Sequence, residues 1–212
     1  MKVYIFGAGG NSKIVSDICY LRGYRILGYY DDVVTGECYR NKIVIGDREK
    51  MFQDIKYNHH NRKFNLIISL GDFRIKQNLI NELLFSFYES EINFINCIHP
   101  SAYISPTAKI GKGNIICYGA VINSDVIIGD HNLINTYAII EHDCSVNNYN
   151  HFAPKSLLCG SVKIGNTNLI GAGSSIIPSI EIGDNNIIGA GSTIIRNISN
   201  DQTVVGVPGA PI

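Results

Sequence analysis

The chain has 212 residues, and its 18 lysines and arginines balance 18 aspartates and glutamates, so the formal net charge is zero. A protein that binds the phosphate backbone of nucleic acid needs a basic surplus or a basic stripe, so this balance argues against that class. Hydrophobic residues make up 45% of the chain, which excludes a disordered protein. Charged residues are few, at 17%, and 24 of the 36 lie within residues 1–98, which indicates two unlike halves.

The first half, residues 1–98, has the pattern of a small α/β domain. Apolar runs at 2–7, 25–30 and 64–70 predict buried strands. Apolar residues at helical spacing predict helices at about 12–22 and 74–87, and a last apolar run at 92–98 closes the domain. Alternating strands and helices predict a Rossmann-like parallel sheet with right-handed crossovers.

A glycine-rich loop follows the first predicted strand and opens the first predicted helix. Residues 7–12 read Gly-Ala-Gly-Gly-Asn-Ser, with serine where the third glycine of a dinucleotide fingerprint would stand. The N–H groups of such a loop can hold a diphosphate against the helix N-terminus, and Asp31 or Asp32, after the second strand, can accept a hydrogen bond from a ribose or base. The alternative is a phosphate-free tight turn capped by Asn11.

The second half is built on a six-residue repeat. From residue 99 to 194 the chain divides into sixteen blocks without an insertion, and the last residue of every block is apolar, usually isoleucine. Six residues suit one short strand and a corner, three such sides close a triangular coil, and stacked coils bury the aliphatic ladder. The repeat therefore predicts a parallel β-helix of about five coils within residues 99–212. A β-sandwich would need irregular turns and a period-2 alternation, and neither is present.

The low charge of this half also bears on assembly. A β-helix has flat faces, and uncharged faces favour coverage by other copies of the chain, so we expect a homo-oligomer. The alternative is a lone β-helix with a hydrated surface of asparagine and serine.

Side chains suited to proton transfer gather in two neighbouring blocks. One block begins Glu141-His142-Asp143, and the next contains His151. Two flanking carboxylates can orient the imidazole of His142 and raise its basicity, which suits a general base near neutral pH. His151 follows His142 by nine positions, or one and a half blocks, which predicts that both reach one cleft. The alternative is a pair of solvated corner histidines.

His59, His60 and the six cysteines are not expected to take part in catalysis or metal binding. His59 and His60 lie in a polar segment and are expected to be solvated. The six cysteines form no C-x-x-C pair, so we expect free thiols and no metal site. The N-terminus lacks the pattern of a secretory signal, and no run of residues is apolar enough for a membrane span, so a cytoplasmic protein without membrane or nucleic-acid partners is expected.

Several motifs together resemble one family. The hexapeptide repeat, the segment Ile140-Glu141-His142-Asp143-Cys144, the later His151 and the ending Val205-Gly206-Val207-Pro208-Gly209 are similar to hexapeptide-repeat acyltransferases. The Gly-Ala-Gly-Gly loop and the Asp31-Asp32 pair narrow the resemblance to two-domain sugar acetyltransferases of the bacillosamine, perosamine and sialic-acid type.

This resemblance implies a left-handed β-helix acetyltransferase domain at residues 99–212, a nucleotide-sugar-binding domain at residues 1–98, and a homotrimer with active sites between adjacent subunits. It implies acetyl-CoA as co-substrate, no metal, and a nucleotide-linked amino sugar as acceptor, with a UDP-linked 4-amino sugar favoured. The alternatives are O-acetylation of a sugar hydroxyl, as on a sialic acid, and a non-catalytic trimeric scaffold that senses a nucleotide.

The resemblance also implies residue roles. His142 is the expected base, Asp143 its orienting carboxylate, and Glu141 the second flanking carboxylate. Acetyl-CoA is expected to contact His151 at the thioester and the backbone of Gly160, Ala172 and Ala190 along the pantetheine. The expected nucleotide-sugar positions are Gly9, Gly10, Asn11, Asp31, Asp32 and Gly71.

Overall fold

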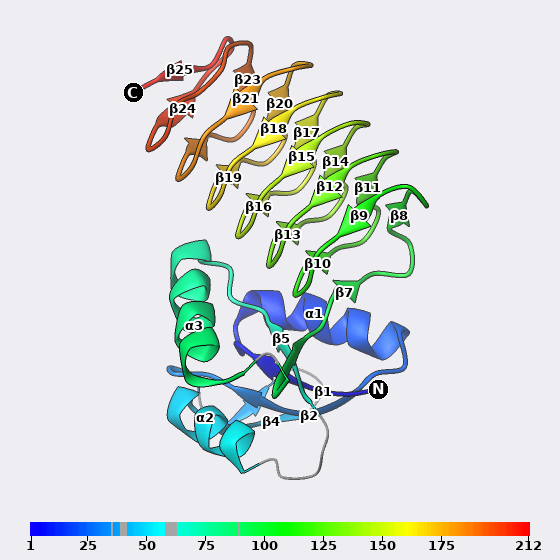
Figure 1. The fold of residues 1–212 in the computed structure, drawn as a ribbon, viewed down its shortest axis with the longest axis vertical. Helices are drawn as coiled ribbons and strands as arrows, with labels where there is room; N and C mark the ends of the chain where they lie inside the picture. Colours follow the sequence, from blue (N-terminus) through cyan, green and yellow to red (C-terminus); the bar gives the residue numbers. More distant parts are fainter. Residues whose placement is uncertain (35, 39–41, 58–62, 89) are drawn as a thin grey trace. The chain divides into compact units, whose positions relative to one another are not determined.

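The computed structural model describes residues 1–34, 36–38, 42–57, 63–88 and 90–212, and the chain divides into two compact units, Met1–Cys97 and Ile98–Ile212 (Figure 1). His59 and His60 lie outside the described residues. In the described segments, no helix combines the length and the apolar character that crossing a membrane requires.

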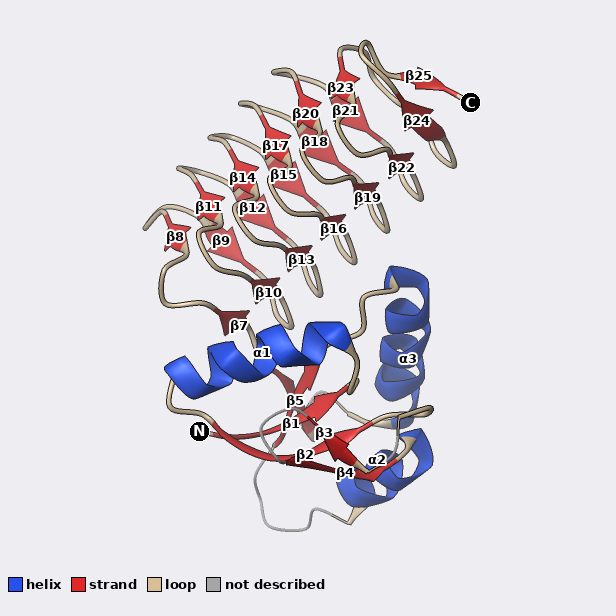
Figure 2. Ribbon diagram, turned by 180° about the vertical axis from the view of Figure 1, so that it is seen from behind, coloured by secondary structure: helices blue, strands red, loops and turns tan. Residues whose placement is uncertain are grey.

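The first unit is a six-stranded sheet with helices; Figure 2 draws its strands in red and its helices in blue. The sheet order is β3-β4-β2-β1-β5-β6, and all pairs are parallel except β3 with β4. Its strands are β1 (Lys2–Phe6), β2 (Arg25–Tyr30), β3 (Glu37–Cys38), β4 (Lys42–Gly46), β5 (Phe64–Ile68) and β6 (Ile92–Phe94), and its helices are α1 (Gly10–Leu21), α2 (Arg48–Lys56) and α3 (Phe73–Ser86). The expected Rossmann-like α/β fold is confirmed.

The central strands β1 and β5 are buried over most of their length, which explains why they read as continuous apolar runs. Three neighbouring elements, β3, β4 and α2, were not predicted from the sequence. Helix α2 buries only Met51 and Ile55, so its apolar stripe is too short to show as a helical period, and the short strands β3 and β4 precede it.

The second unit is the left-handed parallel β-helix that the resemblance implied. Each of the sixteen blocks forms a two-residue strand at its fifth and sixth positions. The strands are β7 (Cys97–Ile98), β8 (Tyr103–Ile104), β9 (Lys109–Ile110), β10 (Ile115–Ile116), β11 (Val121–Ile122), β12 (Ile127–Ile128), β13 (Leu133–Ile134), β14 (Ile139–Ile140), β15 (Ser145–Val146), β16 (His151–Phe152), β17 (Leu157–Leu158), β18 (Lys163–Ile164), β19 (Leu169–Ile170), β20 (Ser175–Ile176), β21 (Glu181–Ile182), β22 (Ile187–Ile188), β23 (Thr193–Ile194), β24 (Thr203–Val205) and β25 (Ala210–Pro211).

Three sheets form the sides of the coil. We call them the first sheet (β25-β24-β22-β19-β16-β13-β10-β7), the second sheet (β23-β20-β17-β14-β11-β8) and the third sheet (β21-β18-β15-β12-β9). From β8 to β23 every pair is parallel and joins residues one coil apart, as Ile122 joins Ile140. The sixth-position side chains fill the interior, where Ile122, Ile140, Leu158 and Ile176 are fully buried. This continuous ladder stabilises the β-helix, because each coil covers the apolar side chains of the next.

The corners turn at the third position of each block. From Gly113 to Gly191 every third-position residue has a positive φ, between 56° and 70°. Most are not glycine, and the left-handed conformation costs such a residue roughly 1–2 kcal/mol. Hydrogen bonds between coils hold these residues in place: the Asp143 N–H donates to Ser124 O at 3.0 Å, and the same pattern recurs along each corner.

A column of buried asparagines supports the corner between the third and first sheets. The amide oxygen of each accepts a hydrogen bond from the backbone N–H one coil later, at 2.8 Å in every case. The column consists of Asn114, Asn132, Asn150, Asn168 and Asn186. These asparagines are therefore part of the scaffold, a role that was not predicted from the sequence.

Candidate active site

Glu141, His142 and Asp143 lie at the corner between β14 of the second sheet and β15 of the third sheet, and we call residues 141–144 the histidine corner. Asp143 is the left-handed residue of this corner, with φ 60°. Its Oδ2 lies 2.8 Å from Nδ1 of the preceding His142. The side chain of His142 is 61% exposed, so the imidazole projects from the β-helix while one of its nitrogens is held.

The hydrogen bond with Asp143 raises the pKa of His142 above its ordinary value, and the negative charges of Asp143 and Glu141 add to the effect. An ionised carboxylate only accepts hydrogen bonds, so Nδ1 of the imidazole is the donor. In the neutral ring the proton is therefore on Nδ1 and Nε2 has the free lone pair. The corner thus presents a basic nitrogen outward, with a carboxylate behind it to stabilise the protonated form.

Both neighbouring coils contact the histidine corner. The imidazole of His142 lies over Gly160 of the next coil, where an added Cβ would come within 2.7 Å of Cε1 and 2.8 Å of Nε2. From the preceding coil, Asn123 donates through Nδ2 to Glu141 Oε2 at 2.7 Å. Asn123 was not predicted from the sequence, although the repeat places it one coil, or 18 residues, before Glu141.

The chain by itself does not bring His142 and His151 to one face. His151 lies in β16 of the first sheet, between Leu133 and Leu169 in the neighbouring strands. The histidine corner joins the other two sheets, so it is the corner opposite that side of the triangular coil. The eight residues between the two histidines carry the chain around the corner and along the third side.

The residues expected along the pantetheine expose backbone donors. Gly160 lies on the histidine-corner edge, whereas Ala172 and Ala190 lie one coil apart on the corner between the first and second sheets. In the part of the chain that the structure describes, the N–H groups of these three residues have no hydrogen bond. At the corner between the third and first sheets, by contrast, a side chain of the next coil accepts a hydrogen bond from the equivalent N–H, as Asp130 does from Lys112 at 2.8 Å.

A cleft of about 460 Å³ lies in the first unit, and we call it the glycine-loop cleft. It opens beyond the carboxyl ends of β1, β2 and β5, where ligands of parallel α/β sheets bind. Its lining consists of Gly7, Gly9, Gly10, Asn11, Asp31, Val33, Val34, Ser69, Leu70 and Gly71. Five of the six expected nucleotide-sugar positions are therefore brought together.

The N-terminus of α1 faces this cleft without a side-chain cap. The N-cap residue is Gly9, and the first turn holds no acidic residue. An added Cβ at Gly9 or Gly10 would meet nothing within 4 Å, so the packing of the chain does not require glycine there. At Gly71 it would meet Nδ2 of Asn11 at 2.7 Å, so that glycine makes room for the asparagine.

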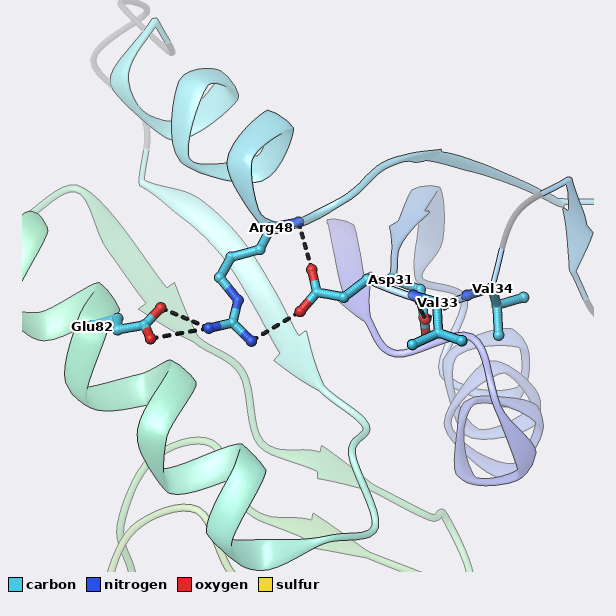
Figure 3. A network of polar contacts seen from close by, with 6 residues as sticks. Asp31, Val33, Val34, Arg48 and Glu82 are labelled. Atoms are coloured by element: carbon cyan, nitrogen blue, oxygen red, sulfur yellow. Dashed lines mark hydrogen bonds and ion pairs between the residues drawn. The ribbon is translucent and has the colours of Figure 1, made fainter.

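Asp31 lies in the wall of the glycine-loop cleft, and Figure 3 shows it beside Val33 and Val34. Its Oδ2 accepts a hydrogen bond from the Ala8 N–H at 2.7 Å, which ties the glycine-rich loop to the end of β2. Its Oδ1 accepts from the N–H groups of Val33 and Val34, both at 2.8 Å. Three of the roughly four lone-pair sites of the carboxylate are therefore used by the backbone.

Asp32 is the one expected nucleotide-sugar residue that does not line the cleft. Its two oxygens accept from the backbone N–H of Arg48 at 2.9 Å and from the guanidinium of Arg48 at 2.8 Å. Nη1 of Arg48 also donates to both carboxylate oxygens of Glu82, at 2.8 and 3.0 Å (Figure 3). Successive residues at the end of a strand point to opposite faces, so Asp31 and Asp32 diverge.

The fold and the histidine corner together define a hexapeptide-repeat transferase with an α/β unit before the β-helix. The family model described as the PglD N-terminal domain matches residues 2–83, and the model described as bacterial transferase hexapeptide (six repeats) matches residues 161–196. A variant of perosamine N-acetyltransferase from Caulobacter crescentus, solved with CoA and GDP-perosamine, is 30% identical with a TM-score of 0.91, covering 100% of this chain and 97% of that one. The chain belongs to the hexapeptide-repeat sugar acetyltransferases.

Two further relatives extend the comparison. The acetyltransferase domain of PglB from Neisseria gonorrhoeae, solved with acetyl coenzyme A, is 27% identical with a TM-score of 0.89, covering 100% of this chain and 98% of that one. An uncharacterised protein of Acanthamoeba polyphaga mimivirus is 36% identical over 115 residues, which is 54% of this chain and 21% of that protein. The chain thus spans about a fifth of the length of this curated relative.

Proposed function

We propose that the chain transfers the acetyl group of acetyl-CoA to the amino group of a nucleotide-linked amino sugar, with His142 as the general base. One observation carries the proposal: the imidazole of His142 is exposed, its Nδ1 is held by Asp143 at 2.8 Å, and its Nε2 is the nitrogen with a free lone pair. The similarity to perosamine N-acetyltransferase supports an amino sugar as acceptor.

In the proposed reaction the amine nitrogen attacks the thioester carbonyl carbon directly. The new C–N bond forms as the C–S bond breaks, and Nε2 of His142 takes the proton that the nitrogen releases. The imidazolium then gives this proton to the departing CoA sulfur, so the products are an acetamide and a free thiol. Asp143 orients the ring and stabilises the imidazolium, and such general base catalysis contributes about 10²–10⁴-fold to the rate.

Acetyl-CoA is the co-substrate in this proposal, and its pantetheine amides need hydrogen-bond partners. The N–H groups of Gly160, Ala172 and Ala190 supply donors of the right kind along two edges of the β-helix. These edges and His151 lie on different sides of one coil. We therefore propose a homotrimer. In it the histidine corner of one subunit lies against a neighbouring subunit, next to the neighbour's His151 and its corner between the first and second sheets.

The glycine-loop cleft is the proposed nucleotide-sugar site. The uncapped N-terminus of α1 binds the diphosphate, because free N–H groups and the helix dipole both favour an anion there. The one unused lone-pair site of Asp31 accepts a hydrogen bond from a ribose or base. Asp32 supports the site from outside by holding α2 through Arg48. A uridine diphosphate is the favoured nucleotide.

The test measures free-thiol release from acetyl-CoA with UDP-, GDP- and dTDP-linked amino sugars, and identifies the product by mass spectrometry. We expect an N-acetylated product, and we expect His142→Ala to lose at least a hundredfold in kcat. An ester product would favour O-acetylation, and the absence of transfer to any acceptor would favour a nucleotide-sensing scaffold. Full activity of His142→Ala would refute the mechanism.

A further inference from the structure

The histidine corner receives a side-chain hydrogen bond from the coil before it. Asn123 and Glu141 occupy the first positions of blocks one coil apart, and the Asn123 amide donates to Glu141 Oε2 at 2.7 Å. The backbone of Asn123 is fixed as well, because its N–H donates to Ile140 O at 2.9 Å. Both side chains are half-buried, so the amide reaches the carboxylate from a rigid edge of the β-helix.

The hydrogen bond from Asn123 restricts the position of the negatively charged Glu141 carboxylate. A glutamate side chain has three rotatable bonds, and one on a surface corner would sample several rotamers. A donor to an ionised carboxylate makes a charge-assisted hydrogen bond, which is stronger than a neutral one. The amide of Asn123 therefore holds the carboxylate next to His142, and the charge of Glu141 helps to raise the pKa of that histidine.

The β-helix does not need an amide at this place. In the following two coils the equivalent first positions hold Cys159 and Ile177, and these corners adopt the same turn, with Ser161 and Ser179 at the left-handed positions. The hydrogen bond between Asn123 and Glu141 is therefore a property of the histidine corner rather than of the repeat.

We propose that Asn123 is a positioning residue for acetyl transfer: it holds the Glu141 carboxylate where its negative charge stabilises the cation formed when the amine gives its proton to His142. This inference rests on the proposed function. Asn123 itself acts only through Glu141, so its contribution exists only while the carboxylate is present.

The experiment is a double-mutant cycle with Asn123→Ala and Glu141→Ala, measured by thiol release with each substrate varied. We expect Asn123→Ala to lower kcat on the order of tenfold, as for a lost hydrogen bond to a charged group, with both KM values and the melting temperature unchanged. In the Glu141→Ala background the second substitution should have no further effect. Asn123→Asp, which places a like charge beside Glu141, should lower kcat further than Asn123→Ala.

Asn93→Ala is the matched control, because Asn93 also donates a side-chain amide hydrogen bond, to Asn65 Oδ1 at 2.9 Å, in the other unit. It should leave kcat unchanged. Equal losses from Asn123→Ala with and without Glu141, or an unchanged kcat, would overturn the inference. If His142→Ala abolishes transfer while Asn123→Ala is fully active, only this inference fails; if His142→Ala is fully active, the proposed function fails.

Discussion

Replacing Gly160 by alanine tests whether the reaction rate depends on the absence of a side chain beneath the imidazole of His142. The added Cβ would lie 2.7 Å from Cε1 of the imidazole, and ordinary contact begins at 3.4 Å. The ring must therefore withdraw by about 0.7 Å, which draws Nε2 away from its position and strains the hydrogen bond to Asp143. Gly160 does not have a positive φ, so alanine fits its backbone conformation.

We expect Gly160→Ala to lower the catalytic rate without lowering the stability of the fold. A misplacement of about 1 Å in a catalytic group can lower the rate roughly 10²-fold, so we expect kcat to fall by about that factor. The side chain of His142 is 61% exposed and can move toward solvent without disturbing the core. Alanine also lowers the conformational entropy of the unfolded chain, which stabilises the folded state by about 0.4–1 kcal/mol. The melting temperature should therefore be unchanged or slightly higher.

The assay combines steady-state thiol release with thermal unfolding followed by circular dichroism. The control is Gly160→Ala in a His142→Ala background, where the ring is gone and the second substitution should not change the residual rate. A raised KM for acetyl-CoA with an unchanged kcat would refute the reasoning, because it would show that Gly160 acts through contact with the co-substrate and not through the imidazole.

Three more predictions concern the same machinery. Asp143 raises the pKa of His142, so Asp143→Asn should lower that pKa and move the acidic limb of the kcat/KM profile to lower pH, with a lower plateau; a limb that shifts upward would contradict this. Gly9→Ala should leave thermal unfolding unchanged, because its Cβ meets nothing within 4 Å, yet raise KM for the nucleotide sugar and not for acetyl-CoA; equal changes in both would count against the cleft. His142→Ala and His151→Ala chains, each inactive alone, should regain activity when co-expressed, since a mixed trimer contains an interface with both histidines intact. No recovery would mean that one chain supplies both residues.

The β-helix and the place of its unusual residues could be predicted from the sequence alone. Apolar side chains recur at every sixth position, and this signal is local, because each block forms the same short strand wherever it lies. The cluster of Glu141, His142 and Asp143 was visible for the same reason, since charges are rare in the repeat. Helix α2 was not visible, because only Met51 and Ile55 of its residues are buried.

Which residues lie together, by contrast, depends on the tertiary structure. Lys155 and Tyr137 have no preference for a left-handed turn, yet the hydrogen bonds of neighbouring coils impose it on both. Asp32 leaves the cleft because Arg48, sixteen residues further on, binds both of its oxygens. His142 and His151 are nine residues apart in sequence but lie on opposite parts of the coil. Which residues lie together depends on contacts between segments that are distant in sequence, and these contacts cannot be predicted from a local sequence pattern.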